Sequence, residues 1–233
     1  MAISEYYKNL DEETFKAVKK ARTELLVELR DTFKEFGVDM WLDSGTLLGA
    51  IRDNDYIAWD SDTDVGIFAS NWSDELFQAI KDRFVITRNF FEKDLSTPML
   101  TIATKAKNGR KKMINKRAII CDIFLMFPHE EKYLYAFWGK WSSNYKMSIP
   151  KWILDEGLEE YEFQGHSFMV PKKYKDYLLD RYGTGWVSPD PDFGWGSFKP
   201  DFKFKVNNYN YNWADGSWSE DDIKRDNNPK TLF

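Results

Sequence analysis

The segment from Ile57 to Phe68 constrains this chain most, because an apolar, strand-like run carries aspartate at three alternate positions, Asp60, Asp62 and Asp64. Successive side chains of a strand point to opposite faces, so we expect the three carboxylates to share one face. Neighbouring carboxylates would then lie about 6.6 Å apart, at roughly 3.3 Å of rise per residue. At that spacing, two carboxylates can ligate one divalent cation or flank a pair of cations.

This acidic pattern is unusual for an ordinary strand. Aspartate is a poor strand former, and like charges on one face repel each other. A bound cation would offset the repulsion, and hard oxygen ligands favour Mg²⁺ or Mn²⁺. We therefore predict a metal site at Asp60, Asp62 and Asp64, with a solvated acidic strand face as the alternative. A calcium loop is disfavoured, because the run lacks the glycine and glutamate of that motif.

Asp122 is a second acidic feature, because it interrupts the apolar run Ala118–Phe127, which is typical of a buried central strand. A buried carboxylate is costly unless it is paired or bound to a metal ion. We expect Asp122 to be a further carboxylate of the metal site. An ion pair with a nearby lysine is the alternative.

A glycine-containing turn, Ser44-Gly45-Thr46, separates a predicted strand over 38–42 from a predicted short helix over 47–52. Glycine lets backbone N–H groups approach a phosphate, and a helix N-terminus favours an anion. Such a turn is common by itself, but here it precedes the acidic strand by about fifteen residues. We therefore predict phosphate binding at Gly45 and Thr46.

The remaining pattern indicates one compact domain with an appendage. Apolar periodicity and turn residues predict a helix over 11–36, a helix over 74–83, strands over 84–91 and 99–105, hairpins at Asn108-Gly109 and Gln164-Gly165, and a helix opened by Pro171 and closed by Gly183. Residues 131–160 have no clear period and receive no assignment. The tail from about residue 186 is rich in Trp, a residue whose large side chain usually packs against other parts of a protein.

Composition excludes several classes of protein. The chain has 233 residues and a formal net charge of −5, whereas general nucleic-acid binders are usually basic. No apolar run reaches the roughly 18 residues of a membrane span, and the polar segment 1–13 is unlike a secretory signal. The single cysteine, Cys121, excludes an internal disulfide and a multi-cysteine metal site. We expect a cytoplasmic protein; no feature fixes its oligomeric state.

The blocks Trp41–Arg52 and Ile57–Asp64 together resemble the signature of the LicD family, which includes bacterial phosphocholine transferases and the fukutin-related proteins. A second set of residues is similar to the family's C-terminal landmark: Phe163-Gln164-Gly165, Val170-Pro171 and Tyr182-Gly183. The chain departs from the family pattern at Ala58, Ser61, Leu125 and Gln164, and none of these departures removes a presumed metal ligand.

The resemblance implies an α+β fold with a DNA polymerase β-like nucleotidyltransferase core, that is, a mixed sheet flanked by helices. It places an N-terminal helix packed on the core over 1–37, the catalytic core over 38–130, and a LicD-type C-terminal region with an aromatic-rich, irregular tail over 131–233. Fold and domain limits are both expectations at this point.

The resemblance also implies an activity: transfer of phosphocholine, ribitol phosphate or glycerol phosphate from a CDP-linked alcohol, such as CDP-choline, to a hydroxyl of a glycan or glycolipid, releasing CMP. In the roles that the resemblance implies, Asp62 and Asp64 are the metal pair, Asp122 is the third carboxylate and Asp60 is an accessory acid. Asp122 would also accept the proton of the acceptor hydroxyl. Gly45 and Thr46 would hold the donor phosphate, with help from Arg52. Mg²⁺ or Mn²⁺ would be the cofactor.

Other interpretations stay open. The basic run over 105–117 predicts that Lys111 and Lys112 contact phosphate or an anionic glycan, with a solvated hairpin tip as the alternative. The chain could instead be a nucleotidyltransferase that consumes an NTP and releases pyrophosphate. An Asp-x-Asp glycosyltransferase would leave Gly45-Thr46 unexplained. A catalytically dead glycan-binding protein is the non-enzyme alternative. His129 and His166 are too scattered for a histidine metal site.

Overall fold

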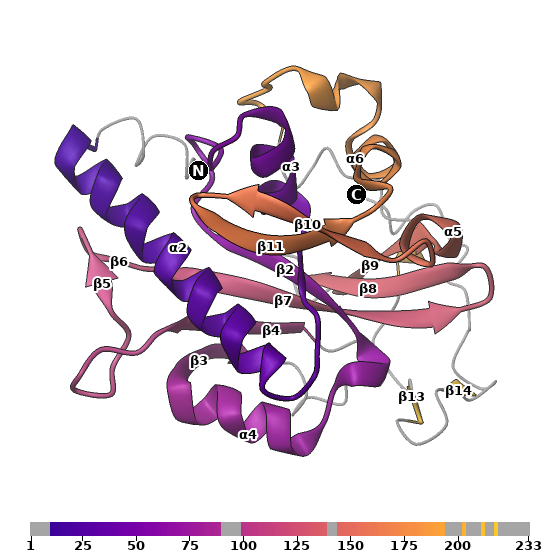
Figure 1. Cartoon of the computed structure of the whole chain (residues 1–233), viewed down its shortest axis with the longest axis horizontal. Helices are drawn as coiled ribbons and strands as arrows, with labels where there is room; N and C mark the ends of the chain where they lie inside the picture. Colours follow the sequence, from indigo (N-terminus) through magenta and orange to yellow (C-terminus); the bar gives the residue numbers. More distant parts are fainter. Residues whose placement is uncertain are drawn as a thin grey trace.

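A computed structural model describes residues 10–89, 99–138 and 144–193, together with the backbone of three short strand segments in the tail (Figure 1). Its centre is a mixed sheet of ten strands within this part of the chain, in the order β10-β11-β1-β2-β7-β8-β9-β12, with β4 also on β7 and β3 on β4. Helices flank the sheet, which confirms the expected α+β class with a mixed, helix-flanked sheet.

The helices and strands have the following bounds. The helices are α2 (Glu12–Lys34), α3 (Ser44–Arg52), α4 (Asp74–Arg83), α5 (Lys151–Leu154) and α6 (Tyr174–Tyr182), with 3-10 turns η1 (Ala69–Asn71) and η3 (Thr184–Val187). The strands are β1 (Trp41–Leu42), β2 (Thr63–Phe68), β3 (Phe84–Asn89), β4 (Met99–Thr104), β5 (Met113–Ile114), β6 (Arg117–Ala118), β7 (Ile120–His129), β8 (Lys132–Trp138), β9 (Asn144–Pro150), β10 (Leu158–Phe163), β11 (His166–Pro171), β12 (Phe202–Lys203), β13 (Tyr211–Asn212) and β14 (Ser217–Trp218).

The long helix α2 confirms the periodicity of residues 11–36. Asp11 caps it by accepting a hydrogen bond from the Thr14 N–H at 2.7 Å. Gly37 ends it in a left-handed conformation with φ +67°. Its apolar stripe is buried in the core, while α2 runs obliquely across the sheet with α4 beside its C-terminal end (Figure 1). The N-terminal helix is therefore an integral part of the core.

The parallel pair β2 and β7 forms the centre of the sheet. Asp64 of β2 stands opposite Asp122 of β7, and both residues are buried. On its other side β2 pairs with β1, where Gly66 faces Trp41. A β-carbon at Gly66 would overlap the Trp41 indole, so only glycine allows β1 to pack this closely. This packing fixes the register that brings the β2 acids next to the turn after β1.

The predicted strand over 57–68 was too long. Strand β2 begins at Thr63, and the residues before it form an irregular segment. The physical reason is that the carbonyls of Asp60 and Asp62 accept hydrogen bonds from the Arg22 side chain rather than from a neighbouring strand. The acids therefore do not converge by strand alternation alone.

The helix predicted to start at Pro171 starts later. Pro171 is the last residue of β11, opposite Leu158, and α6 begins at Tyr174. The hairpin pairing continues past Pro171, because the Lys172 N–H donates to the Gly157 carbonyl at 3.0 Å. The predicted end is confirmed, since Gly183 closes α6 with φ +72°.

Two predicted hairpins are confirmed, and the region that received no assignment contains strands and a short helix. Gln164-Gly165 joins β10 to β11, and Asn108-Gly109 sits in a turn where Ala106 N–H donates to the Arg110 carbonyl at 2.7 Å. Residues 131–160 contain all of β8, β9 and α5, and the start of β10.

The C-terminal region, expected to follow the catalytic core, contributes strands to the same sheet as that core. Strand β11, from the expected C-terminal region, pairs in parallel with β1. The division at residues 37 and 130 stays a prediction. Trp186, at the start of the Trp-rich tail, is partly buried and packs against the core, as expected. Most of the rest of the tail lies outside the described residues, so its expected packing stays a prediction. Among the described helices, none has the length and apolar character needed to cross a membrane.

Candidate active site

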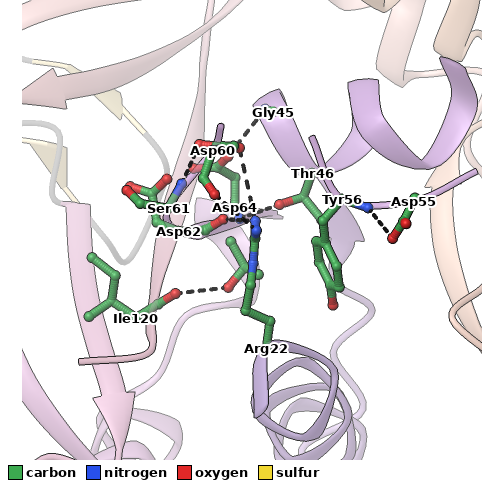
Figure 2. Close-up of polar contacts among 11 residues, drawn as sticks. Arg22, Gly45, Thr46, Asp55, Tyr56, Asp60, Ser61, Asp62, Asp64 and Ile120 are labelled. Atoms are coloured by element: carbon green, nitrogen blue, oxygen red, sulfur yellow. Dashed lines mark hydrogen bonds and ion pairs between the residues drawn. The ribbon is translucent and has the colours of Figure 1, made fainter. Parts of the chain in front are cut away.

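Three carboxylates converge at the start of β2 (Figure 2). Asp60 and Asp62 lie in the segment before the strand and Asp64 lies within it, yet one carboxylate oxygen from each lies within 4.8 Å of the other two. Three hard oxygen donors so close together fit the ligand preference of Mg²⁺ or Mn²⁺. We call these three residues the acidic cluster.

The acidic cluster concentrates unfavourable negative charge. Burial raises the pKa of the Asp64 carboxyl well above its ordinary value, and repulsion from Asp62 and Asp60 adds to the rise. Burial and the Asp62 charge likewise raise the pKa of Asp60, although Arg22 opposes this shift. Two neighbouring acids that resist ionisation together are typical of a functional site rather than a solvated face.

Arg22 of α2 holds the segment that carries the acids. Its buried guanidinium donates to the Asp60 carbonyl at 3.1 Å and to the Asp62 carbonyl, and lies 4.0 Å from the Asp60 carboxylate. It also stacks over the Tyr56 ring, 4.1 Å from the centroid. The sequence argument missed Arg22, although a signal existed: it falls on the apolar stripe of α2, between Val18 and Leu25.

The turn after β1 is joined directly to the acidic cluster. The Gly45 N–H donates to Asp64 Oδ2 at 3.2 Å, and the Asp64 N–H donates to Thr46 Oγ1 at 2.8 Å. A β-carbon at Gly45 would lie 2.5 Å from Asp60 Oδ2, so any side chain at this position would displace the Asp60 carboxylate. The predicted phosphate turn is thus brought to the acids, while the Thr46 hydroxyl holds α3 against β2. Phosphate binding by either residue stays a prediction.

Asp43 and Ser44 shape this turn, although the sequence argument gave neither residue a role in the site. Ser44 is left-handed, with φ +47°, a conformation that costs a non-glycine residue about 1–2 kcal/mol. Asp43 compensates as the cap of α3: its Oδ1 accepts from the Ser44 N–H at 2.5 Å and from the Ser44 hydroxyl at 3.1 Å. The helix thus begins three residues before the predicted start.

Helix α6 supplies further contacts to the turn. Arg181 Nη2 donates to Ser44 Oγ at 2.8 Å, and the Tyr177 hydroxyl donates to Asp43 Oδ1 at 2.6 Å. Burial raises the pKa of the neighbouring Tyr182 phenol; Arg181 opposes the shift and the Asp64 and Asp60 charges add to it, so this ring lies within electrostatic reach of the acidic cluster. Residues of the C-terminal region therefore border the site.

Asp122 lies beside the acidic cluster but outside the group of oxygens within 4.8 Å in the described residues. It is 2% exposed, stands opposite Asp64 across the parallel pair, and its Oδ1 accepts from the Thr101 hydroxyl at 2.5 Å. Because residues in register on neighbouring strands share a face, its side chain projects to the same side as Asp64. Its negative charge also helps to raise the Asp64 pKa. Its role as a metal ligand stays a prediction.

Two of the three cationic candidates, Arg52 and Lys112, pair with acids outside the acidic cluster. Arg52 lies at the other end of α3, about 10 Å along the helix from Gly45, and its guanidinium binds the Asp53 carboxylate at 2.7 and 2.8 Å. Lys112 lies 3.5 Å from the Glu24 carboxylate, and Lys111 is an exposed residue of the hairpin. Substrate binding by these three residues stays a prediction.

Comparison with known proteins agrees with the site. Residues 37–173, more than half of the chain, match the LicD family, described as the LicD/FKTN/FKRP nucleotidyltransferase domain. The chain is 27% identical over 215 residues to the ribitol-5-phosphate transferase FKTN of Mus musculus, covering 91% of this chain and 42% of that protein. The Homo sapiens FKTN is 26% identical over 218 residues, with the same coverage.

A more distant match is the ribitol 5-phosphate transferase FKRP of Mus musculus, 26% identical over 160 residues, or 67% of this chain and 30% of that protein. The chain thus spans about two fifths of the length of the FKTN proteins that it matches. The acids, the glycine turn and the strands that carry them all lie inside the matched segment.

Proposed function

The chain belongs to the LicD family, and from that membership we propose that it transfers a substituted phosphate from a CDP-linked alcohol to a glycan hydroxyl and releases CMP. The observation that carries the proposal is the convergence of three carboxylates beside the Gly45 turn within the matched segment. The names of the matched relatives favour ribitol phosphate over glycerol phosphate or phosphocholine. A DNA polymerase β-like core is part of the same proposal.

A divalent cation fits the donor set of the acidic cluster. Asp60, Asp62 and Asp64 would hold Mg²⁺ or Mn²⁺, with Asp122 beside them. When bound, the cation would neutralise the negative charge of the donor phosphates, which is most of what phosphoryl transfer requires of a catalyst. Two observations support the proposed cation site: the chemistry of the oxygen donors, and the raised pKa of Asp64, which indicates charge repulsion that a cation would relieve.

The chain's own residues would orient the reactants. The N-terminus of α3, with the Gly45 amide, would face the anionic donor. Asp122 would accept the proton of the attacking glycan hydroxyl, and the Thr101 hydrogen bond fixes the orientation of its carboxyl group. The glycan oxygen then bonds to the phosphorus that carries the alcohol, and the bond from that phosphorus to the CMP oxygen breaks.

The test is a donor panel with product identification. The full chain is incubated with Mg²⁺ or Mn²⁺, an acceptor glycan, and in turn CDP-ribitol, CDP-glycerol, CDP-choline and each NTP. Release of CMP together with a mass increase of the glycan supports the proposal. Pyrophosphate from an NTP would support a nucleotidyltransferase instead, an alternative that the family description keeps open. Glycan binding with no product from any donor would support the non-enzyme alternative.

The basic hairpin offers a separate test of substrate contact. If Lys111 and Lys112 bind an anionic part of either substrate, reversing both charges raises the apparent KM by about tenfold at low salt and less at high salt. The matched control reverses Lys34 and Lys81, two exposed lysines of α2 and α4. An equal KM in both double variants would show that the hairpin is a solvated tip.

A further inference from the structure

A buried arginine of α6 lies against the proposed phosphate turn. Arg181 is 7% exposed, and its Nη2 donates to Ser44 Oγ at 2.8 Å across 137 residues of chain. Its Nη1 donates to the Tyr135 hydroxyl of β8, and its guanidinium lies 5.0 Å from the centroid of that ring. One side chain therefore ties α6 and β8 to the first turn of α3.

The Arg181 contact falls on the residue of the turn that most needs support. Ser44 has φ +47°, where its side chain is disfavoured. Its hydroxyl lies between two fixed partners, because it donates to Asp43 Oδ1 at 3.1 Å and accepts from Arg181 at 2.8 Å. Asp43 is in turn held from α6 by the Tyr177 hydroxyl at 2.6 Å. Two residues of α6 thus fix both residues at the start of the turn.

The conformation of Ser44 sets the direction of the next amide. The Gly45 N–H follows directly in the chain and points at Asp64 Oδ2, 3.2 Å away. If Ser44 relaxes to an ordinary right-handed or extended conformation, the peptide bond to Gly45 rotates and its N–H turns away from the acidic cluster. The Arg181 charge also lies next to the α3 N-terminus, where it adds to the attraction for an anion.

We propose that Arg181 is a positioning residue that holds the Ser44-Gly45 turn in its anion-binding conformation. The proposal rests on the proposed function for the identity of the anion, the donor diphosphate. Arg181 lies eight residues beyond the matched family segment, which ends at residue 173. The α6 region is therefore part of the donor site rather than only a covering of the core.

The first test measures the turn itself, without a substrate. Hydrogen–deuterium exchange of peptides covering residues 43–48 is compared in the wild type, Arg181→Met, Arg181→Lys and Leu178→Ala. Leu178 is the matched control, because it is fully buried in the same helix. We expect exchange at least tenfold faster in Arg181→Met, partial recovery in Arg181→Lys and no change in Leu178→Ala. Unchanged exchange in Arg181→Met would overturn the proposal, whatever the enzyme activity.

The second test measures anion affinity and coupling to Ser44. With Mn²⁺ present, Arg181→Met should weaken CDP binding about tenfold and Ser44→Ala by no more than this. The double variant should be no weaker than Arg181→Met alone, because both changes remove the same hydrogen bond between Arg181 and Ser44. The Mn²⁺ affinity itself should stay within about twofold. Additive losses would overturn the proposal. If exchange responds as expected but the wild type releases no CMP from any donor, the reaction is wrong and the positioning role of Arg181 stands.

Discussion

Replacing Asp62 by asparagine tests whether the acidic cluster is built for a cation at the expense of stability. Asparagine keeps the shape of the Asp62 side chain and removes its charge, which helps to raise the pKa of the neighbouring Asp60 carboxyl. A purely structural residue would lose stability on this change. If Asp62 belongs to a metal site, the substitution should instead make the metal-free protein more stable and abolish its stabilisation by metal.

The magnitude follows from the geometry. Two full charges 4.8 Å apart repel each other by about 3.5 kcal/mol at an effective dielectric constant of about 20. Part of this is already relieved, because Asp60 and Asp64 have raised pKa values and hold protons more tightly. We therefore expect Asp62→Asn to raise the free energy of unfolding by about 1–2 kcal/mol in EDTA, or the Tm by roughly 3–6 °C for a chain of this size.

The assay is thermal unfolding in EDTA and in Mn²⁺. A cation at a hundred times its dissociation constant stabilises the wild type by about 2.7 kcal/mol, and so raises its Tm by roughly 5–10 °C. Asp62→Asn should show less than a third of this increase. The matched control is Asp39→Asn, the same change at an exposed position, which should leave both the Tm and the response to Mn²⁺ unchanged.

One combination of results would refute the reasoning. If Asp62→Asn is less stable than the wild type in EDTA and responds to Mn²⁺ by the same amount, its carboxylate neither suffers repulsion nor binds the cation. The acidic cluster would then be a structural feature of the segment before β2.

Three further outcomes follow from the same site. Gly45→Ala places a β-carbon 2.5 Å from Asp60 Oδ2, so CMP release should fall at least a hundredfold with a Tm change of only a few degrees; near-normal turnover would contradict the geometry. Asp122→Asn should abolish turnover but leave CDP-alcohol binding measurable by calorimetry, and normal turnover would exclude Asp122 as the base. In EDTA, the folded state binds the Asp64 proton more tightly than the unfolded state does, because its pKa is raised above 3.8, so this residue lowers the stability of the wild type progressively as pH rises above about 4. The urea midpoint of Asp64→Asn minus that of the wild type should therefore increase from pH 4 to pH 7. A difference that stays constant or decreases would contradict the raised pKa of Asp64.

Local sequence was sufficient for features that depend on short-range geometry. The apolar period of α2, the end of α6 at Gly183 and the hairpin at Gln164-Gly165 are encoded by neighbouring residues, and all three predictions were confirmed. The three acids and the glycine turn were also recognisable, because the chemistry predicted for them demands particular residue types at short spacings. Their family assignment is confirmed by the match over residues 37–173.

The same reasoning failed where a distant residue competes for the backbone. Strand alternation predicted that Asp60 and Asp62 belong to β2, but Arg22, about forty residues earlier, binds their carbonyls and holds them in an irregular segment. Pro171 similarly ends a strand because β10 pairs with it. In each case a tertiary hydrogen bond outweighed a local preference of about a kilocalorie per mole or less.

The sequence by itself thus determined which acids, which glycine and which family this protein has, since these depend on residue identity and close spacing. Only the tertiary structure decided how they meet. Asp122 reaches Asp64 through the parallel register of β2 and β7, and Arg181 reaches Ser44 from 137 residues away. Such contacts are set by how buried surfaces pack together, and no spacing along the chain encodes that packing.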